Sequence, residues 1–108
     1  MRVKFYETVS GRCPVLDYVD KQPVRVQARI LEALSSVEES GLKASRVTFK
    51  QIKGKLWEIK IRFGGAHRIF YVMADKKTLV LLHAFLKKTN KTPQREIETA
   101  MTRMAEII

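Results

Sequence analysis

The chain has 108 residues, of which 45% are hydrophobic, and this size and composition fit one globular domain spanning residues 1–108. It carries 21 Lys and Arg against 11 Asp and Glu, a net charge of +10 at pH 7. A single cysteine, Cys13, excludes an internal disulfide and favours a reducing, cytoplasmic location. No apolar run is long enough for a signal peptide or a membrane span, so we expect no membrane partner.

The N-terminal half predicts one strand followed by two helices. Residues Val3–Val9 alternate between apolar and polar, as a half-buried strand does. A short helix follows with Pro14 in its first turn, and Pro23 opens a second helix that we expect to stop at Gly41. The predicted apolar stripe of the second helix consists of Ile30, Leu31, Leu34 and Val37.

The C-terminal half predicts three strands and a final helix. Leu56–Phe63 and His67–Ala74 are predicted strands, and Thr78–Leu86 is nearly all apolar, as a central strand covered on both faces would be. The basic segment VTFKQIKGKL, residues 47–56, is either a ragged strand or a loop. Thr92-Pro93 starts the last helix, with Thr92 as the cap and Pro93 in the first turn. Its apolar stripe consists of Ile97, Ala100, Met101, Met104 and Ile108.

This order of elements is typical of an α+β domain. We expect an antiparallel sheet with two N-terminal helices and a C-terminal helix packed on one of its faces. The other face of such a sheet is free to be polar. No repeat, linker or low-complexity segment divides the chain.

The positive charge is concentrated in the middle of the chain. From Lys43 to Arg95 there are 14 basic and 2 acidic residues, whereas the remaining residues are 7 basic and 9 acidic. Solubility alone does not require such segregation. The pattern therefore indicates a polyanionic partner.

The predicted hairpin in this region gathers basic side chains on one face. Because side chains alternate along a strand, Lys60 and Arg62 point away from the apolar side. A two-residue glycine turn would place Arg68 opposite Ile61, toward the core, which is costly for an unpaired charge. We therefore predict a three-residue turn, Gly64–Ala66, which places Arg68 opposite Arg62 on the open face. The same register pairs Ile61 with Ile69, Ile59 with Tyr71 and Trp57 with Met73.

A cluster of like charges on a sheet is relieved when an anion binds to it, and arginine matches phosphate with two parallel hydrogen bonds. Lys87, Lys88 and Lys91 follow the last strand and are expected to close the same face. Aromatic residues such as Tyr6 and Phe85 are expected nearby. Because aromatic rings stack on unpaired bases, single-stranded RNA is favoured over duplex DNA.

The residues indicate neither a metal centre nor another cofactor. His67 and His83 stand apart, with few acidic residues near them, and no glycine-rich phosphate loop occurs. RNA can still be cleaved without a metal, because its own 2′-hydroxyl can attack the neighbouring phosphate. The protein then supplies a base, an acid and cations for the transition state. Clustered cations lower one another's pKa, which can make a lysine a usable base.

Two segments between about Leu56 and Ala100 resemble the RelE/ParE toxin superfamily. The first is the hairpin L-W-E-I-K-I-R-F, a glycine turn and H-R-I-F-Y-V, which is generic to the superfamily. The second is L-L-H-A-F-L-K-K-T-N-K-T-P-Q-R-E-I-E-T-A. Its pattern H-A-F-x-K-K-x-x-K-T-P-x-x-E-I is most similar to the phage-derived HigB-like branch.

The resemblance implies a RelE-like fold and a toxin of a type II toxin–antitoxin pair. Such toxins are metal-independent endoribonucleases that cleave mRNA, typically on the ribosome, and thereby inhibit translation. The implied partners are mRNA, the ribosome and a cognate antitoxin with a helix-turn-helix domain. By position, Arg68 would contact the scissile phosphate, Lys60 would assist catalysis, and Lys87 or Lys88 would be the basic residue after the last strand. The residues expected to bind RNA are Arg62, His67, His83, Lys91 and Tyr6.

Two departures from the family pattern leave the acid and base open. Glu58 stands where RelE itself carries a second strand lysine, and Gln94–Ala105 contains no counterpart of its C-terminal catalytic tyrosine. His67 or His83 could substitute. Two other functions also stay open. One is a ParE-like inhibitor of DNA gyrase that is not a nuclease, and the other is a non-catalytic RNA-binding module.

Overall fold

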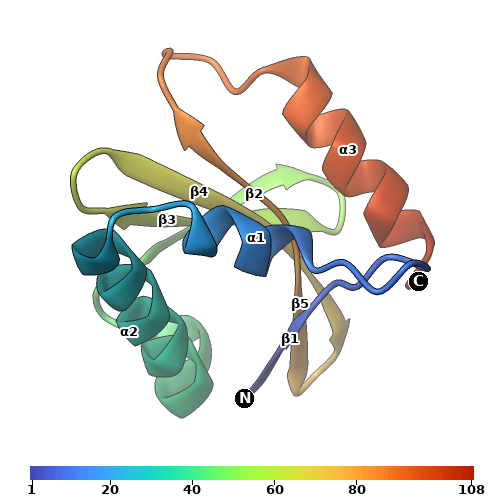
Figure 1. Cartoon of the computed structure of the whole chain (residues 1–108). Helices are drawn as coiled ribbons and strands as arrows, with labels where there is room; N and C mark the ends of the chain where they lie inside the picture. The colour runs from blue at the N-terminus through green and yellow to red at the C-terminus, as the bar shows by residue number, and fades with distance from the viewer.

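The computed structural model describes residues 1–108, which form a mixed α+β fold with a five-stranded sheet (Figure 1). The strands are Arg2–Phe5 (β1), Thr48–Lys53 (β2), Leu56–Arg62 (β3), Ala66–Asp75 (β4) and Thr78–Lys87 (β5). The helices are Pro14–Asp20 (α1), Val24–Ser40 (α2) and Gln94–Ala105 (α3), and a short 3₁₀ turn, Gly41–Lys43 (η1), follows α2. None of the helices combines the length and apolar character needed to cross a bilayer.

The strand order is β1-β5-β4-β3-β2. Strands β2 to β5 pair antiparallel, whereas β1 runs parallel to β5. The prediction of an antiparallel sheet is therefore right for four strands and wrong for β1. A parallel pair needs a long crossover connection, and α1, α2 and three strands provide it here.

The helices cover both faces of the sheet rather than one. The pair α1 and α2 packs on one face, where Val15, Ile30 and Val37 share a core with Ile59 and Ile69. Helix α3 packs on the opposite face, which we call the α3 face (Figure 1). The prediction that one face of the sheet is open and polar is therefore wrong in part. The apolar side chains that α3 helps to cover are those of Leu56, Phe70, Val72, Val80 and Leu82.

Most predicted elements are confirmed, with shifts at their ends. Strand β1 stops at Phe5 rather than Val9, because a turn closed by the Gly11 amide donating to the Thr8 carbonyl follows it. The ambiguous segment contains a strand, β2, and the near-apolar strand β5 lies inside the sheet as predicted. In α2 the buried stripe uses Ala33 in place of Leu31, which is 45% exposed.

The β3–β4 turn has the predicted length but lies one residue earlier in the chain. It comprises Phe63-Gly64-Gly65, with the Phe63 amide donating to the Gly65 carbonyl at 3.0 Å. Both glycines have positive φ, 64° and 124°, a region that side-chain-bearing residues rarely adopt. Lys60 is therefore opposite Arg68, and the predicted pairing of Arg62 with Arg68 is wrong.

The observed register differs from the predicted one by two residues, so each side chain keeps its predicted face. On the face of α1 and α2, Ile59 pairs with Ile69 and Trp57 with Tyr71, instead of the predicted partners. Arg68 does not lie opposite Ile61, whose partner is His67. Arg68 therefore lies on the α3 face, as the odd-length turn required.

Candidate nucleic-acid interface

Four basic residues from three neighbouring strands come together at one end of the α3 face. Lys60 of β3 lies directly opposite Arg68 of β4. In the next row, Arg62 of β3 lies opposite Ala66, which in turn lies opposite Lys87 of β5. Directly opposed residues have Cβ atoms about 4.5–5.5 Å apart, so Lys60 and Arg68 are direct neighbours, whereas Ala66 separates Arg62 from Lys87. We call Lys60, Arg62, Arg68 and Lys87 the basic cluster.

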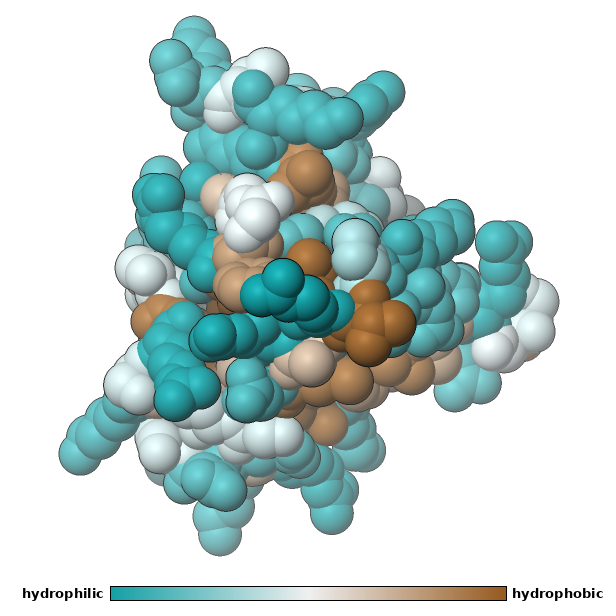
Figure 2. All heavy atoms as spheres, turned by 60° about the vertical axis from the view of Figure 1, so that its left-hand side comes forward, coloured by the Kyte–Doolittle hydropathy of each residue, from teal (hydrophilic) through white to brown (hydrophobic).

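The side chains of the basic cluster range from exposed to nearly buried. Arg62 is exposed, Lys60 and Lys87 are half-buried, and the side chain of Arg68 is only 11% exposed. Phe85, on the other side of Arg68 from Lys60, is buried. An approaching anion would therefore meet the lysines and Arg62 first. The view in Figure 2 turns toward the reader the side of the molecule with α2 and the β3–β4 turn, and hydrophilic side chains cover most of it.

Arg68 is held in place by a buried carboxylate. Its Nη1 donates to Oε2 of Glu58 at 2.8 Å, and the Glu58 side chain is 2% exposed. The contact is diagonal across the strands, since Glu58 lies directly opposite Phe70. Nε of Arg68 and Oε1 of Glu58 are buried without a hydrogen-bond partner. The ion pair thus fixes the guanidinium and leaves one of its donors unused.

The surroundings of Lys60 lower its pKa from the usual 10.5. The largest cause is repulsion by Arg62, followed by partial desolvation and by repulsion from Arg68 and Lys50, while Glu58 opposes the shift. The effect favours the neutral amine. Since the neutral amine is the form that accepts a proton, Lys60 is the residue of the basic cluster best suited to act as a base.

His83 lies on the α3 face, one row from Arg68, and is bonded to α3. Its Nε2 lies 2.8 Å from Oε1 of Glu96, and its Nδ1 lies 3.2 Å from Nη1 of Arg103. A guanidinium only donates, so Nδ1 accepts, and Nε2 carries the proton that it donates to Glu96. Both ring nitrogens are engaged, and an RNA contact by either nitrogen would have to replace one of these bonds.

Tyr6 is also tied to the C-terminal helix. Its hydroxyl donates to Oε2 of Glu106 at 2.8 Å, and this bond is the main reason that its pKa is raised above 10.0. The guanidinium of Arg103 lies 5.5 Å from the centre of its ring. Tyr6 is 8% exposed, so the prediction that it offers a free ring to RNA is wrong.

His67 lies on the opposite side of the sheet from the basic cluster, and its predicted contact with RNA is wrong. It is 1% exposed and packs against α1. The Tyr18 hydroxyl and His67 Nδ1 are 2.7 Å apart, and His67 Nε2 lies 3.2 Å from the Phe63 carbonyl. A carbonyl only accepts, so Nε2 donates to Phe63 and Nδ1 accepts from Tyr18. His67 is therefore buried and bonded on the face of α1 and α2, away from the basic cluster.

We expect Tyr18→Phe to lower the free energy of unfolding by about 1–3 kcal/mol, because it leaves the buried Nδ1 of His67 without a partner. The basic cluster is not touched, so any RNA binding or cleavage by the folded protein should be unchanged. Urea denaturation followed by circular dichroism measures the first effect, and a cleavage assay well below the unfolding transition measures the second. A loss of cleavage at unchanged stability would return His67 to the functional site.

The remaining predicted residues, Lys88 and Lys91, are exposed in the connection between β5 and α3. Both are accessible to a polyanion, but they lie beyond the end of β5 and outside the basic cluster. No three His, Cys, Asp or Glu side chains lie together in a way that could hold a metal ion. The metal independence of the proposed chemistry stays a prediction.

Three residues of the interface were missed at the sequence level. The sequence shows Glu58 only as a departure from the family pattern, whereas the observed register puts it diagonally opposite Arg68. Glu96 and Arg103 are seven residues apart on one helix, so they share a face and both reach His83. That spacing was a usable signal, whereas the sheet face that α3 covers was not visible in the sequence.

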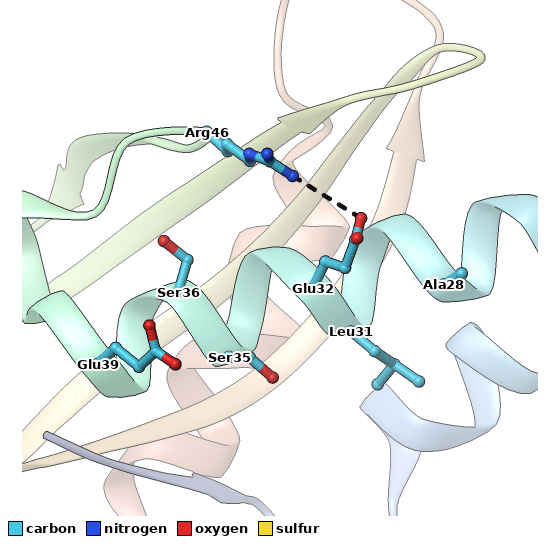
Figure 3. A pocket seen from close by; sticks show the side chains of 7 residues that line it. All are labelled: Ala28, Leu31, Glu32, Ser35, Ser36, Glu39 and Arg46. Atoms are coloured by element: carbon cyan, nitrogen blue, oxygen red, sulfur yellow. Dashed lines mark ion pairs between the residues drawn. The ribbon is translucent and has the colours of Figure 1, made fainter.

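A hollow on the outer side of α2 is distinct from this interface (Figure 3). Its charged side chains are Glu32, Glu39 and Arg46, which makes it acidic overall. Arg46 Nη1 and Glu32 Oε2 form an ion pair at 3.9 Å, with side chains 64% and 58% exposed. Because of this charge balance, the hollow is a poor site for a polyanion.

Comparison with protein-family models identifies one family. A search of curated proteins finds no match. Residues 17–105 match the family model described as phage derived protein Gp49-like (DUF891). The matched region runs from α1 to the end of α3 and contains the whole basic cluster with Glu58 and His83. The chain therefore belongs to the phage-derived Gp49-like family.

Proposed function

We propose that this protein is the toxin of a type II toxin–antitoxin pair and cleaves mRNA as a metal-independent endoribonuclease. The observation that carries the proposal is the basic cluster, in which Lys60 has a lowered pKa and lies opposite Arg68. Arg62 is next on the same face of β3, and Lys87 lies across Ala66 on β5. The resemblance of the hairpin and of the H-A-F-x-K-K-x-x-K-T-P segment to RelE/ParE toxins supports the same reading.

In the proposed reaction the 2′-hydroxyl of one nucleotide attacks the adjacent phosphorus. Lys60, as the neutral amine, takes the hydroxyl proton. The 2′-O–P bond forms and the P–O5′ bond breaks, which leaves a 2′,3′-cyclic phosphate and a 5′-hydroxyl. Arg68 and Arg62 stabilise the extra negative charge on the phosphorane. The ammonium group of Lys87 donates the proton that the leaving 5′ oxygen needs.

The biological setting of the proposal rests on the resemblance alone. As with RelE-like toxins, we expect cleavage of mRNA on the ribosome and a consequent arrest of translation. We also expect a cognate antitoxin with a helix-turn-helix domain, encoded by a neighbouring gene. An exposed cluster of cations is a suitable surface for such a partner to cover.

The test is to express the protein briefly in bacteria and to map transcript 5′ ends, with Lys60→Ala alongside. Lys60 is the better choice than Arg68, since removing Arg68 leaves Glu58 buried and unpaired. New 5′ ends inside translated regions that disappear in the variant would support an mRNA-cleaving toxin. Growth arrest without new ends would reject the nuclease and favour the gyrase inhibitor. RNA binding with neither effect would favour a non-catalytic binding module.

The pH dependence of cleavage gives a second check. If neutral Lys60 is the base, the rate rises with pH toward a midpoint below 10.5. Arg62→Ala removes the largest repulsion, so the pKa of Lys60 rises and less of its amine is neutral at a given pH. The rising limb of the curve of cleavage rate against pH therefore moves to higher pH. Arg12→Ala, an exposed residue that does not act on Lys60, is the control and should leave the limb in place. Identical limbs in wild type and Arg62→Ala would exclude Lys60 as the titrating base.

A further inference from the structure

A second basic surface lies on the other side of Arg62. A groove of about 380 Å³ lies between α2 and the β3–β4 turn, and its lining includes Arg29, Arg46, Arg62 and Phe63. Its only acidic residue is Glu32, so the charged groups sum to a positive balance. The volume is within the range of about 300–1,000 Å³ typical of small-molecule sites. The proposed reaction uses Arg62 but not the other residues of this groove, Arg29, Arg46 and Phe63.

Phe63 gives the groove an aromatic wall that is held in a fixed position. The guanidinium of Arg29 lies 4.9 Å from the centre of its ring. The backbone of Phe63 is bonded on both sides, since its amide donates to Gly65 and its carbonyl accepts from the buried His67. An aromatic ring beside a planar cation is a suitable platform for a nucleic-acid base.

Arg62 connects the groove to the basic cluster. It lines the groove, and it also stands in the row next to Lys60 and Arg68 at the end of β3. A chain of phosphates that leaves the basic cluster around this end of the sheet would therefore meet cations without interruption. On the far side of the Arg46–Glu32 ion pair the surface becomes acidic, as in the hollow of Figure 3, so the basic path ends there.

We propose that this groove binds a nucleotide of single-stranded RNA adjacent to the cleavage position, with its base on Phe63 and its phosphate between Arg29 and Arg62. The inference rests on the proposed function, because it extends the RNA path beyond the basic cluster. Unpaired RNA fits better than a duplex, since only an unstacked base can reach the ring. An aromatic ring with Arg29 over it, in a groove that Arg62 also lines, favours RNA over an acidic protein segment, which needs no stacking platform.

The test is binding of a fluorescein-labelled single-stranded RNA of about ten nucleotides, 2′-O-methylated so that it is not cleaved, measured by fluorescence anisotropy at several salt concentrations. Phe63→Leu should weaken binding by at least about fivefold, since stacking of one base is worth about 1–3 kcal/mol. Phe63→Tyr keeps the ring and should bind like the wild type. Arg29→Ala should weaken binding and reduce the slope of log affinity against log salt by about 0.7.

Two further variants make the result decisive. Arg25→Ala is the matched control, because Arg25 is exposed on the same helix one turn away and does not line the groove. It changes the net charge equally and should bind within about twofold of the wild type. Lys87→Ala reports on the basic cluster alone. Melting curves for Phe63→Leu and Arg29→Ala establish that the variants are folded.

The outcomes separate the two proposals. If Lys87→Ala weakens binding while Phe63→Leu and Arg29→Ala do not, RNA binds the basic cluster only, and the groove inference is overturned with the proposed function intact. If Arg25→Ala weakens binding as much as Arg29→Ala, the effect is general electrostatics and the groove is again rejected. If the wild-type protein fails to bind the RNA, the RNA path and the proposed substrate both fail.

Discussion

Lys60→Ala is expected to reduce RNA cleavage by roughly 10²–10⁴-fold, the usual contribution of a general base. Lys60 is half-buried at the end of the sheet and takes part in none of the ion pairs, so the variant should remain folded. The substitution removes the amine whose lowered pKa makes Lys60 suitable as a base. The measurement is the single-turnover cleavage rate of a defined mRNA, with ribosomes present and absent.

Two further variants distinguish the role of Lys60 as a proton acceptor from the role of its positive charge. Lys60→Arg keeps a cation that cannot be deprotonated in a protein, so it should be nearly as slow as Lys60→Ala. Lys53→Ala, at the other end of the neighbouring strand β2, removes an exposed cation that does not act on Lys60 and should keep most of the activity. Near-wild-type cleavage by Lys60→Arg would mean that Lys60 supplies charge alone, and that the base lies elsewhere.

Breaking the Glu58–Arg68 ion pair is expected to have the largest effect on stability. Glu58→Ala or Arg68→Ala leaves one buried charge without its partner, and such changes typically cost about 3–5 kcal/mol. For a domain whose total stability is about 5–15 kcal/mol, either variant is at the edge of folding. Urea unfolding at fixed pH measures the loss. The exposed Arg46–Glu32 pair is the control, and Glu32→Ala should cost less than about 1 kcal/mol.

The double variant Glu58→Leu with Arg68→Met tests whether the ion pair serves stability or cleavage. Replacing both buried charges by apolar groups of similar size is often neutral or stabilising, so the double variant should unfold close to the wild type. It should nevertheless cleave no RNA, because the guanidinium is gone. A double variant that is folded but inactive would show that Arg68 is needed for cleavage and not for folding. A double variant that is as unstable as the single ones would instead show that the pair supports the packing of the α3 face.

Local sequence patterns predict the structure correctly wherever interactions between neighbouring residues determine it. Pro14 and Gly41 marked a helix start and a helix end correctly, and the alternation of β3 put Lys60 and Arg62 on one face. The near-continuous apolar run of β5 showed a strand covered on both faces. Each of these signals depends on backbone geometry within a few residues, which the sequence contains directly.

The hairpin register was predicted with the right faces and the wrong partners. The turn needs positive φ at Gly64 and Gly65, and two three-residue turns can provide it, Gly64–Ala66 and the observed Phe63–Gly65. In the observed turn, Phe63 leaves the strand and its ring meets Arg29 of α2. A contact with a distant helix is thus part of the observed turn, and no pattern within the hairpin contains that information.

By itself, the sequence determined the α+β class, the three C-terminal strands, the concentration of cations in the middle of the chain and the face on which Lys60, Arg62 and Arg68 gather. Only the tertiary structure decided that α3 covers the same face, that Glu58 holds Arg68, and that His67 and Tyr6 are buried. The physical reason is that alternation fixes which side of a strand a residue faces, whereas burial depends on which distant element packs there. A charge pattern therefore indicates a basic face, and the packing of the helices decides which of its residues remain accessible to a ligand.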